Sequence, residues 1–195
     1  MCGNLYVIIK ENFKIVFRQG VYAAIIFLFL IPYIYGITNL NSEKAAECLG
    51  KLVALIGIPL FVFILKPEQD PDIWDVILTK KFPYHSCILL RIVFAAVLSV
   101  ALIYLFVLYM LYQGCEIPIC TYTMRTAEIS MLIGGIGLLG SIVFRKTLAG
   151  FLLSVSFVFL FYDDFTVMVV RGIQGSVVSI EILLYIIILW LCGKN

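Results

Sequence analysis

Long runs of apolar residues, separated by short polar segments, make up most of the chain. A helix needs roughly 20 residues to cross a hydrocarbon core about 30 Å thick, and in lipid every backbone amide must bond within its own segment. The pattern therefore predicts an all-α membrane protein in which residues 21–195 form a six-helix transmembrane domain. The predicted spans are Val21 to Asn39, Leu49 to Leu65, Ile88 to Tyr112, Ala127 to Phe144, Leu148 to Tyr162 and Val177 to Cys192.

Residues 1–20, ahead of the first span, have a different pattern. Apolar and basic side chains recur there at helical spacing on opposite faces, with Leu5, Ile8, Ile9, Phe13, Val16 and Phe17 on one face and Lys10, Lys14 and Arg18 on the other. This spacing predicts an amphipathic helix that lies at the membrane interface, with its basic face toward anionic headgroups.

The segment from Asp163 to Gly175, between the fifth and sixth predicted spans, is partly apolar and follows a short span. Two interpretations stay open from the pattern alone. The segment dips back into the membrane, or it is a broken helix end at the outer surface, since short spans also occur where the bilayer thins.

Composition supports lipid as the solvent of this chain. Hydrophobic residues make up 63% of it and charged residues only 13%, about half the charged share of a typical soluble domain. The net charge of +2 and the absence of a basic stripe interleaved with aromatic residues argue against nucleic acid as a partner.

The basic residues are divided unequally between the two sets of loops, which predicts the orientation. One set carries ten of them and the other four. We therefore expect a multi-pass protein of the cell (plasma) membrane with both termini in the cytoplasm. The ten are Lys10, Lys14, Arg18, Lys66, Lys80, Lys81, Arg91, Arg145, Lys146 and Lys194, and the four are Lys44, Lys51, Arg125 and Arg171.

The longest predicted cytoplasmic loop, residues 66–87, contains the signals of a short helix. Asp70 suits an N-cap, Pro71 the first helical position, and Phe82 and Pro83 end the helix. Four apolar residues form a ridge on this otherwise charged loop: Ile73, Trp74, Ile77 and Leu78. The ridge fits a groove on another protein, or it packs on the chain's own spans or on lipid headgroups.

In order and spacing, these features resemble the ABC-2 type permeases, the membrane subunits of ATP-driven exporters. The family has a basic amphipathic helix before the first span, then, after the second span, an acidic stretch, a short coupling helix, a proline and a basic residue that opens the third span. The matching features here are Asn4 to Arg18, Glu68 to Asp72, Ile73 to Leu78, Pro83 and Arg91. Where family members often carry Gly-Thr, this chain has Asp-Ile-Trp.

The resemblance implies an ABC-2 (type V) exporter-like fold, with a broken or re-entrant segment near Asp163 to Gly175. It implies a permease that works as a dimer with a second copy or a homologous permease, driven by separate ATPase subunits. Those subunits would bind ATP and Mg; this chain has no P-loop and no catalytic motif, so we expect a transport subunit that is not an enzyme and carries no cofactor. The ATPase would contact Asp72, Ile73, Trp74, Ile77 and Leu78. Arg145 and Lys146 would be a minor contact or, alternatively, a basic turn that only sets the topology.

The cargo that this resemblance allows is a peptide or another small hydrophobic compound, in a bacterial cell. The main alternative is a six-span substrate-binding subunit of a vitamin uptake transporter. Such subunits usually show an Ala-x-x-x-Ala face in the first span, whereas Ala23 and Ala24 are adjacent here.

Further candidate residues lie in or near the spans. Glu128 and Glu181 are ionisable groups near hydrocarbon, so they are candidates for the substrate pathway, although each can also reach water or a structural partner. Lys51 and Arg91 are expected to extend to water from span ends. Cys115 and Cys120 lie in a predicted outer loop where a disulfide can form. The fourth span carries a face of small residues for close helix packing, made of Gly134, Gly135, Gly137 and Gly140.

Overall fold

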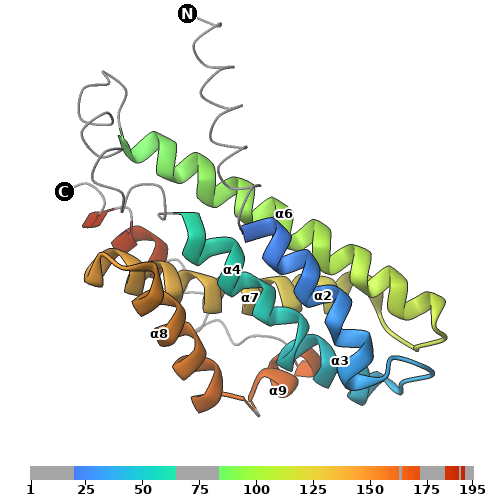
Figure 1. Ribbon diagram of the computed structural model, residues 1–195. Helices are drawn as coiled ribbons and strands as arrows, with labels where there is room; N and C mark the ends of the chain where they lie inside the picture. The colour runs from blue at the N-terminus through green and yellow to red at the C-terminus, as the bar shows by residue number, and fades with distance from the viewer. Residues whose placement is uncertain (1–19, 65–83, 163, 172–182, 189, 192–195) are drawn as a thin grey trace, which may run out of the picture.

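The computed structural model describes residues 20–64, 84–162, 164–171, 183–188 and 190–191, and these residues fold into helices joined by short connections (Figure 1). Residues 183–188 and 190–191 are helical. The principal elements are α2 (Tyr22–Tyr35), α3 (Ser42–Lys51), the 3-10 helix η2 (Val53–Ile56), α4 (Gly57–Val62), α6 (Tyr84–Tyr112), α7 (Ile119–Phe144), α8 (Thr147–Leu160) and α9 (Asp164–Arg171).

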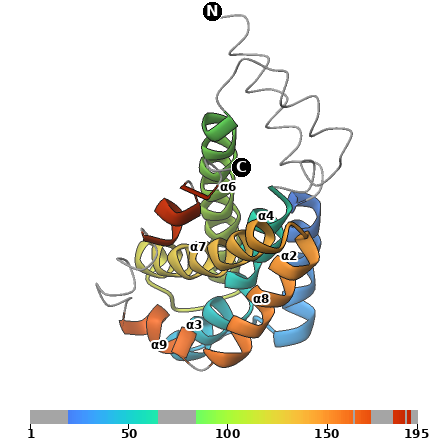
Figure 2. The same cartoon turned by 90° about the vertical axis from the view of Figure 1, so that its left-hand side faces the viewer.

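Helix α7 runs through the middle of the bundle (Figures 1 and 2). It packs on α8, α4 and α6, on η2, and on the two short helices α3 and α9. Helix α6, by contrast, lies along one edge and contacts α7, α4 and η2. The described part of the fold is therefore organised around α7.

Small residues allow the neighbours of α7 to approach it closely. A Cβ added at Gly134 would overlap the ring of Phe61 on α4, and one added at Gly140 would lie 3.0 Å from the Cα atom of Gly150 on α8. The predicted small-residue face is thus confirmed, and it serves packing within the chain.

The connections 36–41 and 113–118 lie together at one end of the bundle, here called the loop end. The Asn39 amide donates a hydrogen bond to the Gln113 carbonyl (3.2 Å), and the Cys115 thiol lies 3.4 Å from the Ile37 carbonyl oxygen. Gly36, with a φ of 67°, ends α2 by adopting a left-handed conformation that glycine tolerates.

The short helices α3 and α9 lie side by side at the loop end (Figures 1 and 2). Helix α9 bends by 77° away from α8. Gly50 permits the approach of α9, because a Cβ at that position would lie 2.8 Å from the carbonyl oxygen of Phe165. The predicted segment after the fifth span is therefore, over residues 164–171, a helix folded back against α3 and α7.

By length and composition, three helical segments in the described ranges can cross a bilayer: Ser42–Val62, Ile88–Tyr112 and Ile119–Phe144. The bent pair α8 and α9 makes a fourth if it is one span. Helix α2, with 14 residues, extends about 21 Å at 1.5 Å per residue, which is shorter than a bilayer core. These three candidate spans fit a membrane protein, and the sixth predicted span falls partly outside the described residues.

The outer surface of the described helices is strongly apolar, as a lipid-embedded protein requires. Tyr33, Phe29, Leu105, Leu148 and Phe159 are all exposed on α2, α6 or α8. In water, contiguous apolar surface of this kind is unfavourable and rare on soluble monomers. Lipid chains remove that penalty, because they are as apolar as the side chains they contact.

Several helix boundaries differ from the predicted spans. The second predicted span begins at Leu49, whereas the helical segment begins at Ser42, because the charged α3 still buries one face through Ala45, Ala46 and Leu49. The fourth begins at Ala127 in the prediction and at Ile119 in the structure, where α7 buries the hydroxyl-bearing side chains of Thr123 and Thr126 that lowered the hydropathy of this stretch. The end of the predicted loop 66–87 belongs to α6, which begins at Tyr84.

Candidate functional site

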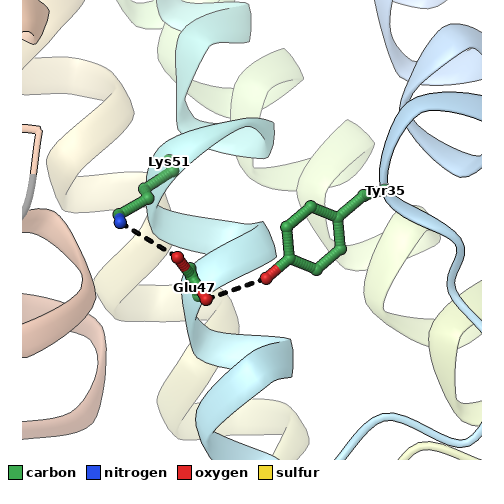
Figure 3. A network of polar contacts seen from close by, with 3 residues as sticks. All are labelled: Tyr35, Glu47 and Lys51. Carbon is green, nitrogen blue, oxygen red and sulfur yellow. Dashed lines mark hydrogen bonds and ion pairs between the residues drawn. The ribbon is translucent and has the colours of Figure 1, made fainter.

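A charged cluster links α2, α3 and the turn after α8 near the loop end, and Figure 3 shows its members Tyr35, Glu47 and Lys51. The hydroxyl of Tyr35 donates a hydrogen bond to Oε2 of Glu47 at 2.9 Å, and Nζ of Lys51 donates to Oε1 of the same carboxylate at 3.0 Å. The Lys51 ammonium also lies 4.4 Å from the centre of the Tyr162 ring. Glu47 therefore bridges a phenol and a cation, and we call Tyr35, Glu47, Lys51 and Tyr162 the Glu47 cluster.

The local sequence explains how the cluster forms. Glu47 precedes Lys51 by four residues on α3, the favourable order for an ion pair on one helix face. The Lys51 side chain is only 12% exposed and the Glu47 side chain 39%, so the carboxylate lies nearer the surface. Both belong to the candidate span Ser42–Val62, and paired ionisable groups inside spans often mark a functional site.

Lys51 and Arg91, which could extend to water from their places near span ends, contact protein groups instead. Lys51 turns to Glu47, and Arg91, 6% exposed, donates from Nη1 to the Ile64 carbonyl oxygen at 3.2 Å. Ile64 follows α4, so the guanidinium satisfies a carbonyl left free where that helix ends.

Arg125 likewise donates hydrogen bonds to carbonyl groups at the end of a helix, in this case α9. Its Nη1 donates to the carbonyl oxygen of Val169 at 3.0 Å and also to that of Val170. Both carbonyls belong to the last turn of α9, where a cation also suits the helix dipole. Arg125 therefore fixes the C-terminal end of α9 to α7.

Sequence reasoning missed the Glu47 cluster because the hydropathy pattern placed residues 40–48 outside the second span. The signal that could have found it is the Glu-x-x-x-Lys spacing beside Ala45 and Ala46, which indicates an amphipathic helix with an internal ion pair. The partner Tyr35 lies 12 residues before Glu47 in another helix, and no sequence pattern pairs the two.

The predicted site residues within the described ranges are not gathered in one place. Glu128 is half-buried on the third turn of α7 instead of at the end of a span, because α7 begins earlier than predicted. Arg145 and Lys146 are exposed in the tight turn between α7 and α8, where Arg145 has a φ of 51°. Cys115 and Cys120 are free thiols, one buried and one exposed at the start of α7, and a disulfide between them stays a prediction.

The predicted ATPase-coupling ridge and one predicted pathway residue lie outside the described residues. Their roles stay predictions from sequence. The residues are Asp72, Ile73, Trp74, Ile77, Leu78 and Glu181. Within the described ranges, no group of three or more His, Cys, Asp or Glu residues could hold a metal ion.

The Glu47 cluster combines a partly exposed carboxylate with a mostly buried cation and two phenols. These groups can form hydrogen bonds and ion pairs. Comparisons with protein-family models, with curated proteins and with solved structures find no match to this chain.

Proposed function

We propose that this chain is the membrane-spanning subunit of an ABC exporter, which forms a translocation pathway as a dimer and is driven by separate ATPase subunits. The observation that carries the proposal is the 77° bend between α8 and α9. The family that the sequence resembles has a broken helical segment at this point, between its fifth and sixth spans. The helical surface of exposed apolar residues on α2, α6 and α8 also supports a membrane subunit.

The distribution of charge supports the proposed orientation. Arg125 and Arg171 belong to the loop end, through the contact of Arg125 with the end of α9. Arg145 and Lys146 follow the opposite end of α7, a helix of 26 residues. We propose that the loop end faces outward and that the turn at Arg145 faces the cytoplasm, where basic residues accumulate.

In the proposed mechanism, closure of two ATPases on ATP pushes on the helix predicted from Asp72 to Lys81 and shifts the permease between two states. A ligand shifts such an equilibrium only through different affinities for the two states. The contacts of the loop end, through the Glu47 cluster and Arg125, would hold the outer side closed until that shift. The cargo would be a peptide or another small hydrophobic compound.

Trp74 provides the test, because a large aromatic side chain that fills a pocket dominates binding energy. We expect Trp74→Ala to weaken co-purification with the candidate P-loop ATPase by roughly thirtyfold, as loss of about 2 kcal/mol implies. The measurement is the amount of ATPase retained on the tagged permease in detergent, together with cargo-stimulated ATP hydrolysis.

The matched control is Trp190→Ala, since Trp74 and Trp190 are the two tryptophans of the chain and Trp190 is 59% exposed on a helical segment. It should leave the amount of retained ATPase unchanged. If Trp74→Ala also retains the ATPase at the parental level, or if no P-loop ATPase co-purifies with the parental chain, the exporter proposal fails.

A further inference from the structure

Three hydroxyl side chains on α7 are buried without a hydrogen-bond partner among the residues that the structure describes. Thr123 is 4% exposed, and Thr126 and Ser130 are 0% exposed. Spacings of three and four residues place them on one face of the helix. In the part of the chain that the structure describes, none of their hydroxyl oxygens has a hydrogen-bond partner. We call these residues the α7 hydroxyl row.

Other buried hydroxyls of the same bundle are satisfied. Ser99 donates to the Ala96 carbonyl at 2.8 Å, and Ser141, on the same helix as the row, donates to the Gly137 carbonyl at 3.0 Å. Ser154 of α8 donates across to the Ile133 carbonyl at 3.2 Å. Unpaired hydroxyls are therefore not a general feature of these helices, and the row differs from its continuation toward Ser141.

The elements around the row are the irregular parts of the bundle. At its inner end, Ser130 lies against Gly57, where a Cβ would come within 2.8 Å of the serine Oγ. Gly57 is the point at which the 3-10 helix η2 gives way to α4, and η2 itself packs on α7. At the outer end, Tyr122 shares a hydrogen bond with Ser42 at 2.9 Å. Helix α9, which also packs on α7, carries a fourth buried hydroxyl oxygen without a described partner, that of Thr166.

We propose that the α7 hydroxyl row binds water inside the bundle, from the loop end of α7 to about its middle. A buried hydroxyl without a partner is unfavourable by an amount comparable to a lost hydrogen bond, and bound water removes that cost. Each hydroxyl offers one donor and two acceptors, so a short file of water molecules can bond to all three. From Thr123 to Ser130 the row extends roughly 10 Å along the helix.

This site is separate from the Glu47 cluster and does not depend on the transport proposal. The row belongs to α7, the helix that packs on η2 and α9.

Isosteric substitution distinguishes a hydrated row from a dry one, because the two cases predict changes of opposite sign in the unfolding equilibrium constant. If water is bound, Thr126→Val removes one of its partners, and we expect the unfolding equilibrium constant in an SDS titration of mixed micelles to rise roughly tenfold. If the row is dry, the same change relieves an unpaired hydroxyl, and the constant should fall. Ser130→Ala should behave like Thr126→Val. Ser141→Ala is the matched control, since its hydroxyl bonds within its own helix.

A direct measurement is brief X-ray radiolysis of the parental protein, in which hydroxyl radicals formed from bound water oxidise neighbouring side chains. We expect oxidation of Tyr122, which is 5% exposed, reduced at least threefold by Thr126→Val and unchanged by Ser141→Ala. Stabilisation by Thr126→Val, or the absence of oxidation at Tyr122, would overturn the proposal. If the parental protein is stable in NaCl and loses that stability in choline chloride, the row binds a cation instead of water, and the proposal is overturned.

Discussion

Two candidate spans of similar length occupy opposite environments in this molecule. In the segment Ser42–Val62, 72% of the apolar window is buried within the protein, whereas for Ile88–Tyr112 the share is 28%. The first is divided into α3, η2 and α4 and contacts most of the bundle, while the second is one continuous helix along its edge. Hydropathy identifies both as spans and does not distinguish an inner helix from a peripheral one.

Side-chain size and polarity account for the difference. The inner segment carries Gly50, Gly57, Ala45 and Ala46, which let other backbones approach. It also carries an ion pair that needs protein partners. Helix α6 instead has large apolar side chains on most of its surface, such as Leu105 and Tyr104, which are exposed. In lipid, small and polar residues therefore direct a helix inward, and large apolar residues are neutral between protein and lipid.

Within the inner segment, the largest expected effect comes from Gly57→Ala. Alanine normally favours a helix over glycine by about 1 kcal/mol, but here the added methyl group would overlap the carbonyl oxygen of Ser130. We expect destabilisation by about 3 kcal/mol, because backbone cannot move aside as a flexible side chain can. The measurement is the unfolding free energy in an SDS titration of mixed micelles.

Ala101→Val on α6 is the control, since Ala101 is exposed on the peripheral helix and added volume there meets lipid or detergent. It should leave stability unchanged. Equal losses of unfolding free energy for the two substitutions would mean that the inner and peripheral helices are packed alike.

The next effect concerns the charged cluster. Glu47→Gln keeps the shape of the side chain but removes the negative charge that pairs with the Lys51 ammonium, which is 12% exposed. We expect a loss of about 1 to 2 kcal/mol, less than for a fully buried pair because Glu47 is partly exposed. The same SDS titration measures it.

Glu43→Gln supplies the comparison on the same helix, because Glu43 is an exposed acidic residue in the first turn of α3. Its effect should be the smaller of the two. If Glu43→Gln destabilises as much as Glu47→Gln, the effect belongs to the charge of α3 in general and the cluster with Tyr35 has no special role.

The sequence predicted the all-helical class, the approximate positions of the long apolar helices and the packing role of the glycines in α7, because these depend on local composition and periodicity. It missed the start of the inner segment at Ser42 and the partners of Glu47 and Arg91. Those features depend on contacts between distant segments, such as Arg91 with the Ile64 carbonyl 27 residues earlier. A window of hydropathy treats a charged residue as outside the membrane, whether or not a partner satisfies it.

A hydrogen bond from Arg91 joins the peripheral helix α6 to Ile64, just after the inner segment. Arg91→Met keeps the length of the apolar part of the side chain but removes the donor to the Ile64 carbonyl. We expect destabilisation of about 1 kcal/mol, as for a single lost hydrogen bond at a buried site. Hydrogen exchange should report the change locally, as faster exchange of the amides of residues 60–64. Unchanged exchange there would mean that α4 does not rely on Arg91.

The smallest effect is expected on the outer face of α6. Leu105 is 61% exposed, whereas Ile103 on the same helix is 0% exposed. Leu105→Ala should change the unfolding free energy by less than about 0.5 kcal/mol, because the lost contacts are with lipid or detergent, which refill the space. Ile103→Ala should cost about 2 to 4 kcal/mol, as for a core cavity. A cost at Leu105 that approaches the cost at Ile103 would mean that protein covers this face. If that cost appeared at high protein concentration and vanished on dilution in detergent, the cover would be a second copy of the chain, and α6 would belong to the proposed dimer contact instead of facing lipid.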